Sequence, residues 1–356
     1  MFSPVFSYTN KIVNNIARIE FDRGIMHQSM VLPEIEVILR KNALIRSVHA
    51  STAIEGNTLT VKEVNNLYKR LTVVAREKEK QEVMNYFDFL EKIDKYHKKG
   101  KITEELLLKI HREISKNTLS HKFFEGHYRT VEVRVENLRT GKVRYRPPDY
   151  VKLPKLVKNL VEWINSSENI SPLIVAGVAH YELVRIHPFV DGNGRTARAL
   201  AALILFTRGY DTRYVTVDEY YDKDRKSYLD ALKTADDSDD LTEWLEYFTQ
   251  GFLISISKVV NELLKPLMIK PALPEDMDLT ENQSKIISFI QENGKITNSE
   301  TRKLLNVSPQ SAYKNLQKLQ DLGILTRKGS GRSTHYTFGR VDERLRKKLM
   351  KNLIYY

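Results

Sequence analysis

The chain has 356 residues, of which 41% are hydrophobic, and it carries a net charge of +12 with no cysteine. This length predicts two or three domains, and the lack of cysteine excludes disulfides and thiolate metal sites. The longest apolar runs, at 173–179 and 199–206, fall far short of the roughly 20 residues that a membrane-spanning helix needs. The N-terminus also lacks the apolar centre of a secretory signal. We therefore expect a soluble, cytoplasmic protein with no membrane partner.

Apolar residues recur every three to four positions from residue 10 to about residue 265, so this part is predicted to be mostly α-helical. One region departs from that period. After Gly126 the chain alternates valines with charged residues, turns around Gly141, alternates again and stops at Pro147-Pro148. This pattern predicts a β-hairpin within a helical protein. Such a hairpin is either a surface flap or an edge that holds an extended peptide by backbone pairing.

The segment 171–186 opens with Ser-Pro and is apolar on most faces, which predicts a buried helix. Because proline disfavours the α conformation in the residue before it, this helix is expected to end at or near His187. Glycines permit a tight loop after it, and a second buried helix is expected to run from Arg195 to a C′ glycine at Gly209. The loop therefore places free backbone N–H groups at a helix N-terminus.

Such a terminus attracts phosphate, because free N–H groups and the positive end of the helix dipole meet there. Arg195 and Arg198 lie three residues apart and are expected to project on the same side, where they can clamp a polyphosphate. Asp191 supplies a hard oxygen ligand that suits Mg²⁺. His187 can take a proton from an attacking hydroxyl, whereas Phe189 is expected to be a core residue. Each feature alone is common in structural loops, but their combination predicts a phosphate site beside a general base.

Beyond a proline-containing linker at 264–278, the sequence predicts three amphipathic helices, a strand, a Gly-rich turn and a second strand. Expected N-caps are Thr280, either Asn298 or Ser299, and Ser308, which is followed by proline at N1. This order resembles a winged helix-turn-helix, with residues 309–321 in the position of the recognition helix.

The same region is strongly basic. Residues 279–356 contain nine lysines and six arginines against six acidic residues, which is +9 of the net +12. This asymmetry fits either nucleic-acid binding or a well-solvated helical surface. The side chains expected to contact DNA are Lys314, Lys318, Arg327, Lys328 and Arg332.

The string HPFVDGNGRTAR at 187–198 resembles the HPFxDGNGRxxR signature of Fic-domain proteins at every specified position, and the resemblance covers roughly residues 105–250. It implies transfer of a nucleoside monophosphate, usually AMP from ATP with Mg²⁺, to a Ser, Thr or Tyr hydroxyl of a target protein. By this resemblance His187 is the general base and Asp191 the metal ligand. The residues that would hold the phosphates are Gly192, Asn193, Gly194, Arg195 and Arg198.

The predicted hairpin at 129–147 falls where Fic proteins keep a flap that aligns the target segment. The resemblance therefore implies target contacts from Arg129, Val131, Val133 and Arg144. By analogy Tyr228 lines the adenine pocket, although a packing role within its helix is an equal alternative.

The segment STAIEGN at 51–57 resembles the inhibitory [S/T]xxxE[G/N] motif that accompanies many Fic domains, with Ser51, Glu55 and Gly56 at the matching positions. The resemblance implies a helix-borne glutamate that pairs with Arg198 and so takes this arginine from the γ-phosphate. Nucleotide would then bind in a non-productive pose. In relatives the same glutamate can orient water for removal of AMP, and the sequence leaves both roles open.

Two common alternatives are excluded. Each Gly-Lys pair is followed by Ile or Val, so no Walker A loop exists, and the nine histidines show no HExxH spacing. His180 lies two helical turns before His187 and is expected to be packed or hydrogen-bonded rather than a metal ligand.

Two alternatives stay open. The first is a DNA-binding regulator whose Fic domain senses nucleotide, although winged helices also mediate protein contacts. The second keeps the enzyme but changes the donor to UTP or a cytidine diphosphate ligand. Separately, the resemblance alone implies a homodimer.

These observations predict a mainly α-helical chain in five parts. They are an N-terminal helical region with the inhibitory motif (1–104), a Fic catalytic domain with a hairpin flap (105–263), a linker (264–278), a winged helix-turn-helix domain (279–340) and a basic tail (341–356).

Overall fold

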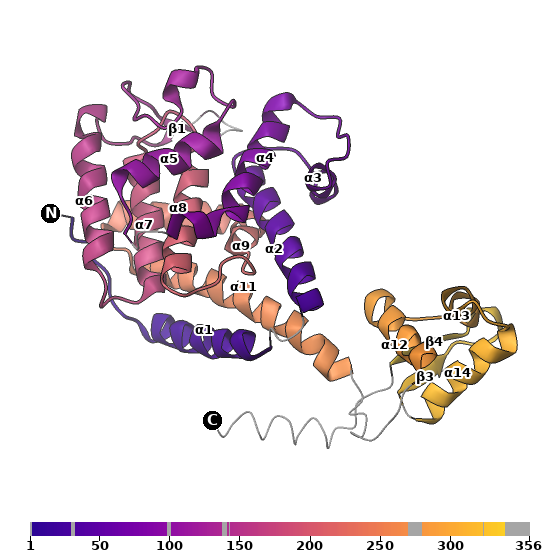
Figure 1. Ribbon diagram of the computed structural model, residues 1–356. Coiled ribbons are helices and arrows are strands. Elements are labelled where there is room, and N and C mark those ends of the chain that lie inside the picture. The colour runs from indigo at the N-terminus through magenta and orange to yellow at the C-terminus, as the bar shows by residue number, and fades with distance from the viewer. Residues whose placement is uncertain are drawn as a thin grey trace. The chain divides into compact units, whose positions relative to one another are not determined.

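The computed structural model describes residues 2–29, 33–97, 101–136, 141, 143–269, 280–322 and 324–338. The chain divides into two compact units, residues 1–260 and 261–356, each of which is described by itself. The first unit is helical apart from one small hairpin, as the sequence predicts (Figure 1). Within the described ranges, no helix has the length and apolar character needed to cross a membrane.

The first unit contains α-helices joined by short loops and three 3-10 helices. In chain order the elements are α1 (Asn10–Ser29), α2 (Pro33–Ile54), α3 (Val61–Tyr68), α4 (Glu77–Glu91), η1 (Ile93–His97), α5 (Glu104–Ser115), η2 (Lys122–Phe124), β1 (Val135–Glu136), β2 (Val143–Tyr145), η3 (Tyr150–Lys152), α6 (Leu153–Ser166), α7 (Pro172–Ile186), α8 (Asn193–Thr207), α9 (Val217–Lys223), α10 (Arg225–Ser238) and α11 (Thr242–Ile269).

Helices α7 and α8 lie side by side in the interior of this unit, and α2, α5 and α6 pack around them (Figure 1). α7 approaches α11 closely at Gly177, where a Cβ would lie 2.7 Å from the side chain of Leu245. The fully buried Trp244 donates its indole N–H to the Gly177 carbonyl oxygen at 2.8 Å. This close packing fixes α7, and with it the start of the loop that leads into α8.

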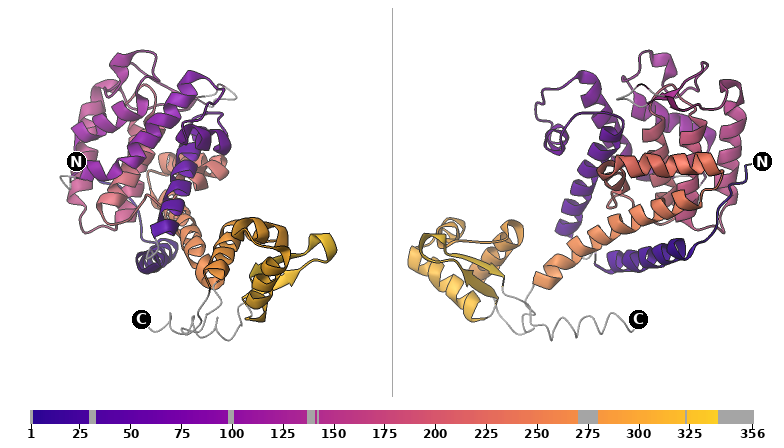
Figure 2. Two further views of the ribbon diagram at one scale, coloured as in Figure 1. Left: turned by 45° about the vertical axis from the view of Figure 1, so that its right-hand side comes forward. Right: turned by 180° about the vertical axis from the view of Figure 1, so that it is seen from behind.

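The N-terminal helices cover two sides of this interior. α1 lies along α11 (Figure 2), where Asn15 donates to the Thr249 hydroxyl at 3.2 Å. α2 packs against α4 and α9, and it also contacts α8. Buried apolar residues along α2, such as Val48 and Ile54, hold the helix in this position.

The predicted hairpin is present but short. β1 and β2 pair antiparallel, with Val135 opposite Tyr145 and Glu136 opposite Val143. The Tyr145 hydroxyl donates to the Arg185 carbonyl oxygen at 3.0 Å, which ties this hairpin to α7. Most of the expected turn lies outside the described residues.

α11 continues to Ile269, six residues into the segment predicted as a linker. The apolar pattern of the helix runs through Leu263, which is 4% exposed, so the helix has no reason to end there. The remainder of the predicted linker and the predicted tail lie outside the described residues.

The second unit contains α12 (Glu281–Asn293), α13 (Asn298–Leu305), α14 (Pro309–Asp321), β3 (Leu325–Lys328), η4 (Gly331–Ser333) and β4 (His335–Phe338). α14 coincides with the predicted recognition helix, and Thr280 and Ser308 are N-caps as expected. The expected cap of α13 is wrong, because Thr297 caps this helix and accepts from the Glu300 N–H at 3.2 Å. The Glu300 carboxylate in turn accepts from the Thr297 N–H, and this capping box makes Thr297 the N-cap.

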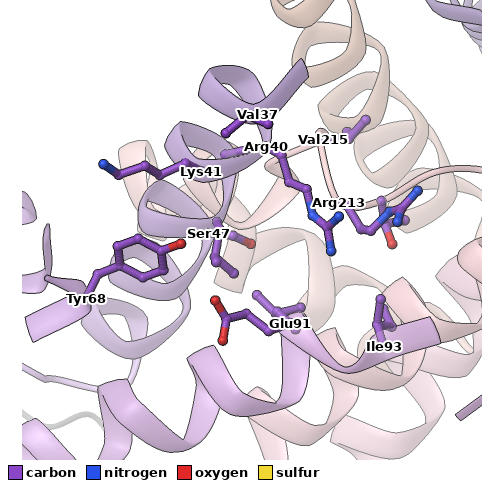
Figure 3. Close-up of a pocket in the computed structure, with 13 residues that line it drawn as sticks. Val37, Arg40, Lys41, Ser47, Tyr68, Glu91, Ile93, Arg213 and Val215 are labelled. Carbon is purple, nitrogen blue, oxygen red and sulfur yellow. The ribbon is translucent and has the colours of Figure 1, made fainter. Parts of the chain in front are cut away.

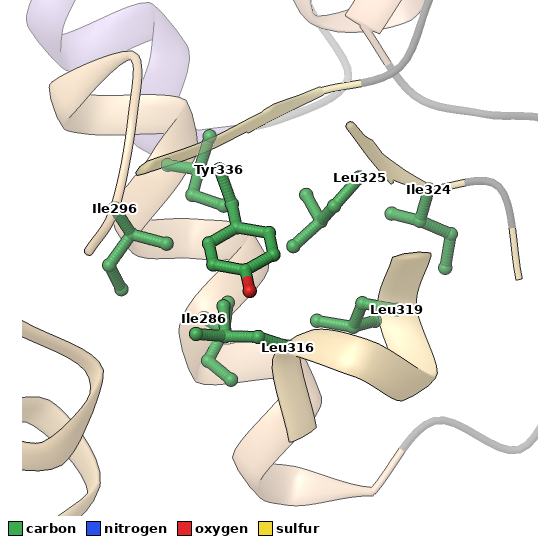
Figure 4. Packing of buried hydrophobic residues seen from close by; sticks show 8 residues of the cluster. Ile286, Ile296, Leu316, Leu319, Ile324, Leu325 and Tyr336 are labelled. Atoms are coloured by element: carbon green, nitrogen blue, oxygen red, sulfur yellow. The ribbon is translucent and has the colours of Figure 1, made fainter. Parts of the chain in front are cut away.

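The core of the second unit draws on all parts of its fold (Figure 4). Side chains from α12, α14 and both strands are buried together, and Tyr336 is 2% exposed among them. The backbone of Tyr336 pairs with Ile296 just before α13. β3 and β4 pair antiparallel, as a wing requires.

Candidate functional site

The loop between α7 and α8 begins at His187, whose φ of 50° ends α7 in the left-handed conformation. Pro188 follows, and α7 ends where the sequence predicts, with His187 outside the right-handed α region. α8 begins at Asn193, two residues earlier than predicted, and Gly192 is its N-cap with φ 83°. The Asn193 side chain closes the loop, because it both donates to and accepts from the backbone of Phe189 at 2.9 Å.

The N-terminus of α8 is open. No side chain caps it, so the N–H groups of Asn193, Gly194 and Arg195 have no acceptor within the helix. Together with the helix dipole they make this end of α8 favourable for an anion. The Asn193 side chain is engaged inside the loop and only 2% of the residue is exposed, so only its backbone can contribute to such a cradle.

Arg195 is buried beneath this loop, with 1% of its surface exposed. Its guanidinium lies 3.4 Å from Glu82 Oε1 and 3.6 Å from Asp191 Oδ1. Its Nε and Nη1 nevertheless have no hydrogen-bond partner in the described part of the chain. Unused donors on a buried cation are costly, so an oxyanion that accepts from them would be stabilised.

Arg198 shares none of these partners. Its Nη2 donates to Glu55 Oε1 and to the Ser51 carbonyl oxygen, and its Nε donates to Ser51 Oγ, all at 2.8 Å. Asp218 Oδ1 lies 3.4 Å from the same Nε. Burial alone would lower the pKa of Arg198, but Glu55 and Asp218 are among the groups that raise it well above its usual value. Nη1 lacks a hydrogen-bond partner among the described residues.

The predicted pair between Glu55 and Arg198 is therefore present. Glu55 lies in the turn that follows the end of α2 at Ile54, and not on the helix itself. Gly56, at φ 95°, continues this turn. A Cβ on Gly194 would overlap Glu55 Oε1, so the carboxylate lies directly against the open N-terminus of α8. It occupies the place where this helix end would otherwise hold an anion.

Asp191 is 46% exposed at its side chain, and its Oδ1 accepts from the Gly192 N–H at 2.6 Å. Lys78 lies 3.6 Å from Oδ2. Burial would raise the pKa of Asp191, but the nearby Arg195 and Lys78 hold it below its usual value, so it is ionised at neutral pH. No group of three potential ligands gathers among the described residues. One accessible carboxylate still fits Mg²⁺, which takes one or two carboxylates and completes its shell with water and phosphate oxygens.

His187 is partly buried, with its Nδ1 3.2 Å from the Val184 carbonyl oxygen. Nδ1–H donates to that oxygen, so Nε2 keeps its lone pair. Burial lowers the pKa of His187 below its ordinary value. The imidazole is therefore neutral at physiological pH and is able to accept a proton at Nε2.

Arg129 anchors the loop from beneath. It is 1% exposed, and its guanidinium donates to the carbonyl oxygens of His187 at 2.9 Å, Val131 at 3.0 Å and Pro148. Its backbone N–H donates to the Pro188 carbonyl oxygen at 2.9 Å. The prediction that Arg129 contacts a target is wrong, because a buried guanidinium that serves three carbonyls has no free surface.

The other flap residues are more accessible. Val131 is 49% exposed and Val133 is half-buried. The side chain of Arg144 lies outside the described residues. Val131 and Val133 therefore stay predictions as target contacts.

A cavity of about 390 Å³ opens beside His187, between the hairpin, α7 and α10. Val135, Val143 and Tyr145 line the hairpin side, and the α10 side includes Leu232 and Asp236. Tyr228 does not line this cavity. It is 2% exposed, and its hydroxyl lies 3.0 Å from His180 Nε2, which favours the packing alternative. His180 is thus hydrogen-bonded within the core, as predicted.

Three residues near the loop had no signal in the sequence. His111 on α5 stacks on Phe189 with ring centroids 3.7 Å apart, accepts from the Gly126 N–H at Nδ1, and donates from Nε2 to the Asp191 carbonyl oxygen at 2.9 Å. Burial lowers the pKa of His111 to about 4, so this neutral tautomer is kept. Lys78 and Glu82 on α4 are the other two. Each meets its partner more than 110 positions away in the chain, which no local pattern reveals.

The second unit exposes a basic surface on α14 and the wing. Lys314 and Lys318 are exposed on α14, four residues apart, and Arg327 and Lys328 are exposed on β3. The side chain of Arg332 lies outside the described residues. The structure thus leaves these four cations accessible to a polyanion.

Comparison with known proteins matches two regions of the chain. Residues 101–205 match the Fic/DOC family, and residues 279–326 match the winged helix-turn-helix DNA-binding family. A protein adenylyltransferase Fic from Nematostella vectensis is 30% identical over 205 residues, which is 56% of this chain and 45% of that protein. The chain thus matches less than half the length of this relative.

Solved structures extend the likeness. A Fic family protein from Desulfovibrio desulfuricans has a TM-score of 0.66 at 25% identity, covering 95% of this chain and 98% of that one. A Fic domain containing signaling protein from Bacteroides thetaiotaomicron has a TM-score of 0.60 at 23% identity, covering 72% of this chain and 97% of the other, and shares the fold. Residues 101–205 are therefore similar to Fic/DOC domains, and residues 279–326 are similar to winged helix-turn-helix modules.

Proposed function

We propose that the chain is a self-inhibited protein adenylyltransferase, which transfers AMP from ATP to a Ser, Thr or Tyr hydroxyl of a target protein. One observation carries the proposal. Arg195 and Arg198 are buried with unused N–H donors beside the open N-terminus of α8, and His187 keeps a free Nε2 next to them. This arrangement supports phosphate binding and proton transfer at adjacent points.

The reaction follows from these positions. The target hydroxyl oxygen attacks the α-phosphorus, the bond to the β-phosphate oxygen breaks, and pyrophosphate leaves. His187 Nε2 takes the hydroxyl proton. The N–H groups at the start of α8 and the two guanidinium groups offset the charge on the phosphates. Mg²⁺ held by Asp191 would neutralise further phosphate charge when bound.

The cavity beside His187 is the place for the nucleoside. Its volume of about 390 Å³ lies in the range of small-molecule pockets. Asp236 lies on its wall and accepts from the Tyr181 hydroxyl at 2.8 Å through Oδ1, which leaves Oδ2 as an acceptor. This oxygen can accept from the exocyclic amino group of adenine, so the wall is compatible with ATP as the donor.

Glu55 is the brake in this proposal. Its carboxylate pairs with Arg198 and lies against the N-terminus of α8, so it competes with phosphate for both. The pair is partly buried, with the Glu55 side chain 32% exposed. A phosphate that replaced Glu55 would also have to displace the hydrogen bonds that Arg198 donates to Ser51. Nucleotide would therefore be excluded from the productive pose until Glu55 moves away.

The test compares three purified proteins: wild type, Glu55→Gly, and Glu55→Gly/His187→Ala. Each is incubated with Mg²⁺ and ATP labelled at the α-phosphate, and label on protein is measured. We expect label on the single variant, little on wild type and none on the double variant. Equal label on wild type and Glu55→Gly would contradict the brake. Label that survives His187→Ala would contradict the base.

The same carboxylate has a second candidate role, in the removal of AMP. Protein labelled by the Glu55→Gly variant is returned to wild type and to Glu55→Gly/His187→Ala, and loss of label is followed. Faster loss of label with wild type would assign AMP removal to Glu55 as well. Equal loss would leave Glu55 with the inhibitory role alone.

A second candidate function rests on the winged helix. The match to a DNA-binding family and the exposed cations of α14 favour a DNA-binding regulator whose Fic domain senses nucleotide. Label in the transfer assay would argue for the enzyme, with the winged helix binding DNA or a protein in addition. If no nucleotide gave label on protein and the chain bound DNA in a salt-dependent manner, the regulator would be favoured.

A further inference from the structure

A second cavity of about 390 Å³ lies in the first unit, apart from the loop at 187–192 and the start of α8 (Figure 3). α2 forms one wall, and the others come from Tyr68 at the end of α3, from the end of α4 and from the segment 212–215. It is equal in volume to the cavity beside His187 and shares no wall residue with it. Its size is that of a small-molecule site.

The walls are apolar at several points, such as Ala43, Leu44 and Val215, but they also carry charge. Arg40, Lys41 and Arg213 are cationic and Glu91 is the one carboxylate among the residues described on these walls. In Figure 3 the Arg40 guanidinium and the Tyr68 hydroxyl point into the space, and the Lys41 ammonium points away from it.

Among the described residues, Arg40 is the cation of this cavity that has no ion-pair or aromatic-ring partner. Arg213 is engaged by Asp211 at 2.5 Å, and Lys41 lies 5.7 Å from the centre of the Tyr68 ring. No described carboxylate forms an ion pair with Arg40, and Glu91 likewise has no ion-pair partner in the described ranges. An unpaired guanidinium at the rim of an apolar cavity is suited to bind an oxyanion in a bidentate manner.

This cavity is connected to the proposed brake. Ser47, on its α2 wall, donates to Asp218 Oδ2 at 2.5 Å, and Asp218 Oδ1 lies 3.4 Å from Arg198 Nε. A smaller cavity of about 40 Å³ shares Ser47, Leu90, Thr212 and Val215 with it and reaches Arg198. Ser47 on the α2 wall is therefore two contacts from the arginine that Glu55 holds.

We propose that this cavity is a regulatory site for a small organic anion, with a ring seated on the apolar wall and a carboxylate or phosphate bound by Arg40. By joining α2 to the 212–215 segment, the ligand holds Ser51 and Glu55 on Arg198 and strengthens the brake. The regulatory effect rests on the proposed function, whereas the binding site does not.

The first test measures binding to the full-length protein by saturation-transfer NMR and calorimetry. The probes are phenyl phosphate and benzoate, with phenol as the uncharged match and inorganic phosphate as the anion without a ring. We expect both ring anions to bind more tightly than phenol and inorganic phosphate, and excess AMP to leave their affinity unchanged. The stronger of the two anions tells whether phosphate or carboxylate is preferred.

Variants assign the site. Arg40→Gln is expected to weaken both ring anions about tenfold or more, because a charge-assisted hydrogen bond is lost. Arg18→Gln, at an exposed arginine of α1, is the matched control and should leave binding unchanged. Ala43→Leu narrows the cavity without a change of charge and should also weaken binding. The site would be overturned if the ring anions bound no more tightly than phenol. It would also be overturned if Arg40→Gln and Ala43→Leu both stayed folded and bound the ring anions as tightly as wild type.

The second test adds each ring anion to the transfer assay. Label on wild type is expected to fall severalfold at saturation, and label on Glu55→Gly to stay constant because the brake is absent. Binding without this difference would overturn the coupling to Glu55 while leaving the site in place. If no variant transfers nucleotide at all, the proposed function fails, and the binding experiment still decides on the site.

Discussion

The carboxylate of Glu55 lies against the α-carbon of Gly194, at a point where any side chain on Gly194 would overlap it. The same carboxylate pairs with Arg198 at 2.8 Å. Gly194 and Arg198, both on α8, thus contact a carboxylate that comes directly after α2 in the chain. The contact explains why phosphate and Glu55 would exclude each other, since both need the bare end of α8.

Ser51 is expected to contribute to the brake. Its hydroxyl accepts from Arg198 Nε at 2.8 Å, so Ser51→Ala removes one of the bonds that hold the arginine away from phosphate. One such bond contributes about 1 kcal/mol, which predicts a rise of about fivefold in labelling, smaller than that of Glu55→Gly. Labelling is compared in the transfer assay, with Ser166→Ala, an exposed serine of α6, as the control. A rate unchanged from wild type would remove Ser51 from the brake.

The pH dependence follows from His187. Its neutral form accepts the proton, and burial lowers its pKa below the ordinary 6.5. Because a lowered pKa keeps the base neutral to lower pH, the acid limb of kcat/KM for Glu55→Gly is expected below pH 6.5. Initial rates measured at constant ionic strength from pH 5 to pH 8, a window of about three units around an ordinary histidine, test this. An acid limb above that value would mean that another group limits the reaction.

Lys78 would compete with a metal ion for Asp191. Its ammonium lies 3.6 Å from Asp191 Oδ2, with the lysine side chain 56% exposed. Lys78→Met is therefore expected to lower the Mg²⁺ concentration for half-maximal labelling of the Glu55→Gly protein, about two- to fivefold, as for a screened surface pair. Lys80→Met, which removes a lysine paired with Glu77, is the matched control. A higher Mg²⁺ requirement would instead show that Lys78 assists the phosphates.

The winged helix predicts a salt-dependent interaction. If Lys314 and Lys318 contact phosphates, each substitution by Gln should reduce the slope of log K against log salt by about 1. Fluorescence anisotropy with a duplex oligonucleotide over a range of salt measures this. Lys285→Gln on α12, whose lysine pairs with Glu281 at 2.7 Å, is the control. No binding at low salt would favour a protein partner for this surface.

Local chemistry made part of the structure predictable. Pro188 and Gly209 end the two central helices as expected, because the conformational limits of proline and glycine act on their immediate neighbours. Ser308-Pro309 likewise marks the start of α14. The resemblance at 51–57 also located the glutamate that meets Arg198, although its place just after the helix was missed.

Other parts depend on contacts that only the fold creates. Arg129 lies in a sequence with the alternation of an exposed strand, yet its guanidinium is buried, where it donates to the nearby Val131 carbonyl and to the more distant carbonyls of Pro148 and His187. Tyr228 is predicted by analogy to line a pocket, but its hydroxyl lies at hydrogen-bond distance from His180, 48 positions away. His111 and Glu82 lie on amphipathic helices whose patterns indicate burial but not which group of the loop each one meets.

Ser47, Ser51 and Glu55 lie at intervals of four residues, and all three contact the Asp218–Arg198 pair. A helix turns about 100° per residue, so this spacing keeps Ser47 and Ser51 on one face of α2, and Glu55 follows them in the turn at the end of the helix. Inserting a single alanine between Ser47 and Ser51 would rotate the two ends of the helix by that angle relative to each other. Only one set of contacts could then stay in register. The length of this short stretch is therefore constrained as strictly as its side chains, and a shifted register should disconnect the cavity from the catalytic loop without altering either.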